Sequence, residues 1–159
     1  MLPLMRRCLL SISILLLTCL NPVHAVQVAN DSVVSKEYNL LMQVRGHEVT
    51  AICIMNMEAD AHIVGTVINE FGVKVFDFTY DNGKAHILNV FGPLNKWYIR
   101  KVLRGDFSFI LSNIGRGENV VKKKRRLDVM PNGDINVCDE RYNINYLFTP
   151  IKAENEITE

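Results

Sequence analysis

The residues that could perform catalysis do not form a recognisable constellation in this sequence. Beyond residue 25 the chain has three histidines, His47, His62 and His86, and none is paired at the spacing of metal ligands. No serine stands in the Gly-x-Ser-x-Gly turn of a nucleophile elbow. A nucleophile, a base and an orienting group could still converge from distant segments, but no pattern points to them. We therefore expect a non-catalytic protein that holds neither a metal nor another cofactor.

One carboxylate stands inside an apolar strand-like run. By alternation Asp77 shares a face with Val73 and Val75, and not with Phe76 and Phe78. A carboxylate with a raised pKa at such a position could act as an acid or a base. Because aspartates are usually exposed or ion-paired, we favour a solvated or salt-bridged strand residue.

Two cysteines remain beyond the first 25 residues. Cys53 and Cys138 both lie in strand-like runs, where buried free thiols are at least as frequent as a disulfide. A disulfide requires Cα atoms about 4.4–6.8 Å apart, which spacing along the chain does not reveal. The sequence has no Cys-x-x-Cys and no Cys/His cluster at zinc spacing.

The densest run of charge is basic. It consists of Lys122, Lys123, Lys124, Arg125 and Arg126. On a single strand these side chains would point alternately to both faces, so we expect neither face of the segment to be buried. Lysines commonly protect an exposed edge strand from aggregation, which is the interpretation we favour. The alternative is contact with a partner or with anionic lipid headgroups, at about 1 kcal/mol per basic residue. Nucleic acid is not expected, because no stacking aromatic residues accompany the run.

The first 25 residues are typical of a secretory signal peptide. Arg6 and Arg7 precede an apolar run from Cys8 to Leu20, and Val23-His24-Ala25 resembles a cleavage site. The run has about 13 residues, fewer than the roughly 20 that span a bilayer as a helix. The expected location is the bacterial periplasm or the inner face of the outer membrane.

Lipidation is the alternative to cleavage after Ala25. Cys19 could receive the lipid, although Thr18 stands where a smaller residue usually precedes such a cysteine. Loss of the leader removes Arg6 and Arg7, so the formal net charge changes from +1 to −1, with 16 basic and 17 acidic residues. This balance is too neutral for a typical nucleic-acid binder.

The remaining chain alternates as a series of strands. Five strands are expected at residues 38–44, 49–57, 61–69, 73–80 and 84–90. Asp81-Asn82-Gly83 is the strongest hairpin signal, since Asn-Gly suits a type I′ turn. Several of these strands carry apolar residues on both faces, so both faces of the sheet require a cover.

A helical segment is expected next. Pro93 suits a helix start, Gly105 predicts an interruption, and Asp106 predicts the cap of a second short helix that ends at Gly115. Further strands are expected at 120–130, 135–138 and 141–148. The last would place Tyr142, Ile144, Tyr146 and Phe148 on one face.

The expected fold is mainly β: a curved antiparallel half-barrel with a helical lid between the fifth and sixth strands. We expect an N-terminal arm at 26–36, a single domain at 37–150 and a flexible acidic tail at 151–159. Two apolar faces under one helical lid predict a pocket for an acyl chain. The residues expected to line it are Val75, Phe76, Phe78, Ile87, Trp97 and Val102. The alternative is that these residues, with Phe71, Tyr80 and Tyr98, form an ordinary filled core.

Three segments carry a family resemblance. Residues 72–83 hold a strand, an Asp-Asn-Gly turn and the start of a second strand; residues 103–107 hold Leu-Arg-Gly-Asp-Phe; residues 142–146 open the final strand. Over roughly residues 37–149 the chain resembles the bacterial lipoprotein carrier and receptor proteins (LolA/LolB-like) and small lipoproteins related to them.

The resemblance implies an incomplete barrel with helices over its mouth. It further implies a cavity that holds the acyl chains of lipoproteins in transit to the outer membrane, and no enzymatic step. Two hypotheses follow. One is an exported lipid- or lipoprotein-binding protein. The other is a periplasmic interaction module with a filled core, which binds a partner or an anionic membrane through residues 122–126.

Overall fold

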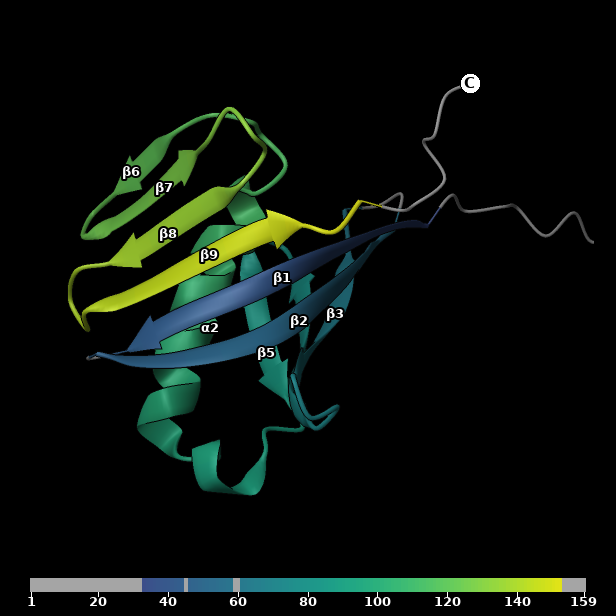
Figure 1. The fold of residues 1–159 in the computed structure, drawn as a ribbon, viewed down its shortest axis with the longest axis vertical. Coiled ribbons are helices and arrows are strands. Elements are labelled where there is room, and N and C mark those ends of the chain that lie inside the picture. The colour runs from purple at the N-terminus through teal and green to yellow at the C-terminus, as the bar shows by residue number, and fades with distance from the viewer. Residues whose placement is uncertain (1–32, 45, 59–60, 153–159) are drawn as a thin grey trace, which may run out of the picture. The chain divides into compact units, whose positions relative to one another are not determined.

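The computed structural model describes residues 33–44, 46–58 and 61–152 (Figure 1). They belong to one compact unit, Asp31–Glu159. The expected leader, Cys19 and residues 153–159 of the expected tail lie outside the described residues. Residues 34–36 were expected to belong to the N-terminal arm, but they belong to the first strand, which begins at Val34.

In the part of the chain that the structure describes, nine strands form one antiparallel sheet, and a single α-helix follows the fifth strand. The elements in chain order are β1 (Val34–Val44), β2 (His47–Met57), β3 (Ile63–Asn69), β4 (Lys74–Asp81), β5 (Lys84–Leu88), the 3₁₀ turn η1 (Gly92–Leu94), α2 (Trp97–Asn113), β6 (Val120–Lys122), β7 (Arg125–Val129), β8 (Ile135–Asp139) and β9 (Ile144–Pro150). The sheet order is β5-β4-β3-β2-β1-β9-β8-β7-β6. The prediction of a mainly antiparallel β protein is confirmed.

Local turn chemistry places the strongest predicted hairpin. Asn82 and Gly83 have φ values of +49° and +78°, and Asp81 pairs with Lys84 across the two-residue loop. These are the positive φ angles that Asn-Gly tolerates in a type I′ turn.

The second β region differs from the prediction at two positions. The expected strand over 120–130 is a hairpin of β6 and β7, which turns at Lys123, with φ +58°, and Lys124. The final strand begins at Ile144, so Tyr142 lies in the preceding turn and not on the strand face. Ile144, Tyr146 and Phe148 do share the buried face, as predicted.

The two expected short helices are one helix. Gly105 lies within α2 and does not end it. A Cβ atom at this position would lie 2.5 Å from Nη2 of Arg125, so the missing side chain lets the guanidinium group of β7 approach the helix backbone. Asp106, the expected helix cap, is a buried residue in the middle of the same helix. Both predictions were wrong because Gly105 and Asp106 contact Arg125 of β7, which lies on the other side of the core.

The sheet curves around α2. The helix contacts both β5 and β7, which stand seven strand spacings apart in the sheet order. A flat sheet would separate these strands by about 34 Å at 4.8 Å per spacing, whereas a helix with its side chains is about 10–12 Å wide. The strands must therefore wrap around the helix, as Figure 1 shows.

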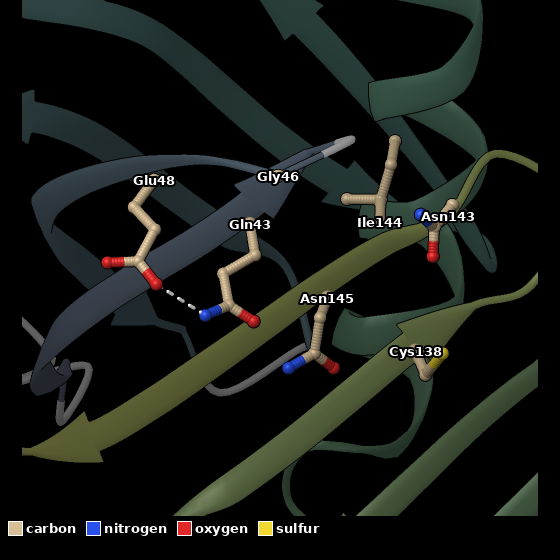
Figure 2. Close-up of a pocket in the computed structure, with 7 residues that line it drawn as sticks. All are labelled: Gln43, Gly46, Glu48, Cys138, Asn143, Ile144 and Asn145. Atoms are coloured by element: carbon tan, nitrogen blue, oxygen red, sulfur yellow. Dashed lines mark hydrogen bonds between the residues drawn. The ribbon is translucent and has the colours of Figure 1, made fainter.

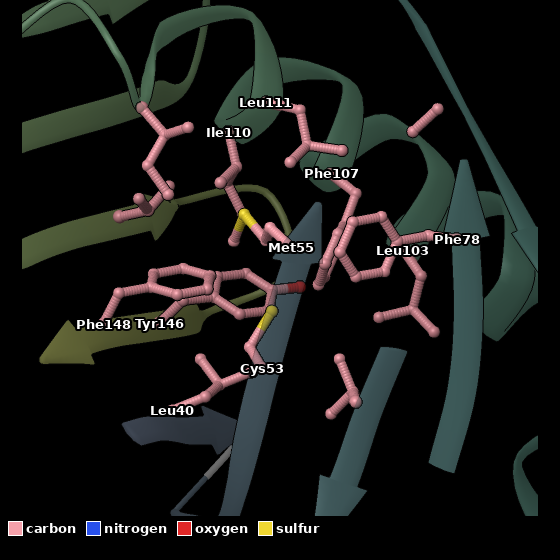
Figure 3. Packing of buried hydrophobic residues seen from close by; sticks show 14 of the residues in the cluster. Leu40, Cys53, Met55, Phe78, Leu103, Phe107, Ile110, Leu111, Tyr146 and Phe148 are labelled. Atoms are coloured by element: carbon pink, nitrogen blue, oxygen red, sulfur yellow. The ribbon is translucent and has the colours of Figure 1, made fainter. Parts of the chain in front are cut away.

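Aromatic rings fill the space between the helix and the sheet. The ring of Phe107, on α2, lies 5.1 Å from the rings of both Phe76 and Phe78 on β4 and 6.3 Å from that of Tyr146 on β9, measured between centroids. Figure 3 shows Phe107 pointing from the helix toward Phe78 and the strands beneath it. One aromatic side chain thus joins the two halves of the sheet in a common core.

Side chains of α2 also protect one edge of the sheet. The hydroxyl of Ser108 accepts a hydrogen bond from the Ala85 N–H at 2.8 Å, and Arg100 donates to the Ile87 carbonyl at 3.1 Å. These backbone groups belong to β5, the edge strand. Their capping removes donors and acceptors that another chain could otherwise pair with.

A β-bulge changes the faces of β4. Val67 pairs with Phe76 and Ile68 with Lys74, so Val75 is an extra residue between them. Val75 and Phe76 are therefore both buried, although strict alternation would place them on opposite faces.

Candidate functional site

Four polar side chains converge in the interior between α2 and strands β7–β9. Nε of Arg125 lies 2.8 Å from Oδ1 of Asp106 and 3.2 Å from Oδ2 of Asp139. The Tyr146 hydroxyl donates a hydrogen bond to Oδ2 of Asp106 at 2.8 Å. Asp106, Asp139 and Tyr146 are each at most 1% exposed. We call these four residues the buried charge cluster.

Arg141 closes the cluster from the turn after β8. Its backbone N–H and its Nε donate to Oδ1 of Asp139 at 2.9 and 3.0 Å, and its Nη2 bonds Oδ2 of the same residue. The same Nη2 stands 3.8 Å from Oδ1 of Asp106. Arg141 therefore neutralises mainly the carboxylate of Asp139.

This arrangement separates the pKa values of the two carboxyl groups. Burial raises the pKa of Asp106 to about 6, and the neighbouring Asp139 adds to this, against the hydrogen bonds from Tyr146 and Arg125. Burial would also raise the pKa of Asp139, but the hydrogen bonds from Arg141 and from Asp106 lower it to about 2. A protonated Asp106 beside an ionised Asp139 resembles an acid–base pair in its electrostatics.

The carboxylates of the cluster are nevertheless buried, since the side chains of Asp106 and Asp139 are each 1% exposed. None of its residues lines either of the two pockets described below. The cluster instead links the helix to three strands. The sequence did not reveal it, since Asp106 was expected as a helix cap. Arg125 was expected to be exposed, but its side chain is only 16% exposed and ion-paired.

The residues expected to line a cavity occupy two environments. Val75, Phe76, Phe78 and Ile87 are buried in the hydrophobic core. Val102 is partly buried and packs against this core, whereas Trp97 is 75% exposed.

A first pocket lies at the end of the central strands (Figure 2), with a volume of about 240 Å³. Gln43, Asn145 and Cys138 face outward there from β1, β9 and β8 and stand opposite one another in register. The Gln43 amide donates to the Glu48 carboxylate at 2.7 Å. The lining of this first pocket is rich in side-chain amides and includes one thiol, that of Cys138.

A second pocket, of about 310 Å³, includes Asp77, Thr66 and Leu88 in its lining. Asp77 accepts hydrogen bonds from Lys74 at 3.0 Å and from Asn89 at 2.7 Å. Burial acts to raise its pKa, but the hydrogen bonds from Asn89 and Lys74 and the positive charge of Lys74 outweigh burial and lower it. The predicted salt-bridged strand residue is therefore confirmed.

The two cysteines do not form a disulfide. Cys53 and Cys138 are both free. They stand on β2 and β8, which β1 and β9 separate, so the three strand spacings alone contribute about 14 Å to their separation, and along β1 they align with Tyr38 and Gln43, which are out of register with each other. This exceeds the reach of a disulfide.

The basic run at 122–126 is partly exposed and partly buried. Lys122, Lys123 and Lys124 are exposed at the β6–β7 turn, and Arg126 is exposed in an ion pair with Asp128 at 2.8 Å. Arg125 belongs to the buried charge cluster. The expectation that both faces of this segment are exposed was wrong, because β7 packs one face on the core.

Large apolar side chains are exposed at one end of the sheet. The β3–β4 turn and the residues after β5 lie at this end, because β4 runs antiparallel to both neighbours. The Phe91 N–H bonds the Val75 carbonyl at 2.8 Å, which joins the two segments. We name this surface the aromatic end; it comprises Phe71 (80% exposed), Trp97 (75%), Tyr98 (55%), Phe91 (48%) and Leu94 (37%).

Sequence reasoning missed this surface. Phe71 and Tyr98 were weighed as core residues and Trp97 as a cavity residue. The positions of these residues in the chain could have indicated that they are exposed, since Phe71 precedes the turn glycine Gly72 and Trp97 begins the helix.

No protein-family model matches this chain, and no curated protein matches it. Within the described residues, no helix has both the length and the apolar character needed to cross a bilayer.

Proposed function

We propose that this chain is an exported, non-catalytic lipid-binding protein of the bacterial periplasm or outer membrane. The curved sheet serves as a half-barrel, α2 as its lid, and the aromatic end receives the acyl chains of a lipid or lipoprotein. The observation that carries the proposal is the exposure of five large apolar side chains on segments at one end of the sheet.

The chemistry of the aromatic end suits a lipid interface. Trp97 and Tyr98 lie side by side, with ring centroids 6.0 Å apart, and Trp and Tyr are enriched where membranes meet water. Lys96 and Lys101 are exposed on the same segment and complement anionic headgroups. Burial of each large apolar side chain contributes about 1.5–3 kcal/mol.

The packing of α2 supports entry at this end. The buried residues of the helix begin at Leu103, so its first six residues are held less firmly than the rest. Ile87 lies beneath them, since its carbonyl accepts a hydrogen bond from Arg100, and the Val75 carbonyl accepts one from Phe91 in the segment that precedes the helix. An acyl chain that displaces the start of α2 therefore reaches residues expected to line the cavity. This route is consistent with the resemblance to lipoprotein carriers.

The test uses Trp97, which is the only tryptophan of the chain. Its fluorescence is recorded while phosphatidylglycerol vesicles containing brominated acyl chains are added. We expect a blue shift and quenching by the bromine atoms. The double variant Phe71→Ser/Leu94→Ser should weaken binding at least tenfold, because it removes two apolar contacts.

Val121→Ser is the matched control. Val121 is 72% exposed but lies on β6, in the other half of the sheet, so this variant should bind as the unmodified chain does. An unchanged Trp97 spectrum with vesicles, or equal losses in the control and the double variant, would contradict the proposal.

The exposed lysines at the β6–β7 turn favour a second candidate function, in which the chain binds an anionic membrane or partner electrostatically. Changing Lys122, Lys123 and Lys124 to Glu should then abolish binding to anionic vesicles at low salt. Binding that survives this change but fails in the Phe71/Leu94 variant assigns the function to the aromatic end.

A further inference from the structure

The helix α2 is attached to the two sides of the sheet by different chemistry. Toward β5 it bonds backbone groups through Ser108 and Arg100. Toward β7–β9, every hydrogen bond and ion pair of α2 in the described residues involves Asp106. One buried carboxylate therefore makes all the polar attachments on that side.

The charges that face Asp106 do not satisfy two ionised carboxylates equally. Arg125 approaches from β7 and is shared between Asp106 and Asp139. Arg141, after β8, makes its close contacts with Asp139. Tyr146, on β9, supplies a neutral hydroxyl. Asp106 is thus the carboxylate with the weaker cationic support, and a proton on it relieves the repulsion between the pair.

We propose that the buried charge cluster is a proton-operated clasp, which holds α2 against β7–β9 more tightly in mildly acidic than in neutral surroundings. The clasp is a property of the fold that goes beyond lipid binding, and it can be measured without any lipid. In a half-barrel with a helical lid it would make the freedom of the lid depend on pH.

The direction of the effect follows from proton linkage. In the closed arrangement the pKa of Asp106 is raised from 3.8 to about 6, and it returns toward 3.8 when the helix lifts and water reaches the carboxyl group. The closed arrangement therefore binds the proton more tightly. Lowering the pH from 7.5 to 5 should reduce the equilibrium constant for opening about tenfold.

Asp139 acts in the opposite direction, but at lower pH. Its pKa is lowered from 3.8 to about 2 in the closed arrangement, so its support is complete above pH 4 and is lost as the pH falls toward 2. Attachment of α2 should accordingly be strongest near pH 4, close to the pKa that both carboxyl groups have in the open arrangement.

Hydrogen exchange of the full chain tests the clasp. Protection factors of the α2 amides, corrected for the intrinsic pH dependence of exchange, are compared at pH 5 and 7.5. We expect protection about tenfold higher at pH 5 in the unmodified chain. Asp106→Asn, which is neutral at both pH values, should show less than a twofold difference. Asp128→Asn, in an exposed ion pair on β7, is the control and should keep the tenfold difference.

A second variant leaves the charges in place. The Tyr146 hydroxyl lowers the pKa of Asp106, so Tyr146→Phe should move the midpoint of the pH dependence upward. The proposal is overturned if the unmodified chain is equally or better protected at pH 7.5, if Asp106→Asn keeps the tenfold difference, or if the midpoint in Tyr146→Phe is unchanged or lower.

Discussion

Replacement of Arg125 by Met removes the cation that two buried carboxylates share, while it keeps an apolar stem of similar length. Nε of Arg125 lies within 3.2 Å of both Asp106 and Asp139, whose side chains are each 1% exposed. Removal of one partner from a buried ion pair costs about 3–5 kcal/mol, because the remaining charge is left without compensation. We expect Arg125→Met to lower the free energy of unfolding by this amount at pH 7.5.

The cost should shrink in acid. Without Arg125 the pKa of Asp106 rises further, since this arginine is one of the groups that lower it. The variant then keeps a proton on Asp106 at pH values where the unmodified chain has lost it. Each pH unit of that difference is worth about 1.4 kcal/mol. The destabilisation should therefore be smaller at pH 5 than at pH 7.5.

Urea unfolding followed by far-ultraviolet circular dichroism measures both free energies. Arg126→Met is the matched control, because the neighbouring arginine forms an ion pair with Asp128 in which both side chains are at least one-third exposed. An exposed pair contributes about 0–1 kcal/mol. Equal losses in the two variants at pH 7.5, or a loss in Arg125→Met that does not decrease at pH 5, would refute the role assigned to the cluster.

Two further predictions concern the core. Gly65→Ala should lower the free energy of unfolding by about 1–3 kcal/mol, because its Cβ would lie 2.2 Å from Cζ of Phe78 and 2.5 Å from the Ile54 carbonyl oxygen. Gly92→Ala is the control, since no atom lies within 4 Å of its Cβ. In the same urea experiment this variant should change the free energy of unfolding by less than about 0.5 kcal/mol. Burial raises the pKa of the Cys53 thiol to about 12. Iodoacetamide at pH 8 should therefore leave Cys53 unmodified in the folded chain and alkylate the partly exposed Cys138. Peptide mapping that finds equal alkylation of both cysteines would show that Cys53 is accessible.

Much of the strand arrangement could be read from neighbouring residues alone. Asn82-Gly83 predicted a tight hairpin, and the alternation of Ile144, Tyr146 and Phe148 predicted one buried face. Both signals depend on geometry within a few residues of the chain, namely positive φ at a turn and the two-residue repeat of a strand. The helical segment before β6 was likewise predicted, because apolar residues recur there at helical spacing.

The candidate sites could not be predicted in the same way. Asp106 meets Arg125 and Tyr146, which stand 19 and 40 residues later in the chain. Asp and Gly within a helical stretch have common local roles as cap and stop, and only the approach of β7 gives Gly105 and Asp106 their actual roles. The aromatic end also depends on packing, because hydropathy cannot distinguish a buried Trp97 from an exposed one.

The sequence by itself determined that this chain forms an antiparallel sheet with one helical segment, since turn chemistry and side-chain alternation are encoded residue by residue. Only the tertiary structure decided which charges are buried together and which aromatic residues stay in contact with water. Those outcomes arise from the curvature of the sheet around α2, which brings together side chains from β4, β7, β8 and β9 that are distant in the sequence.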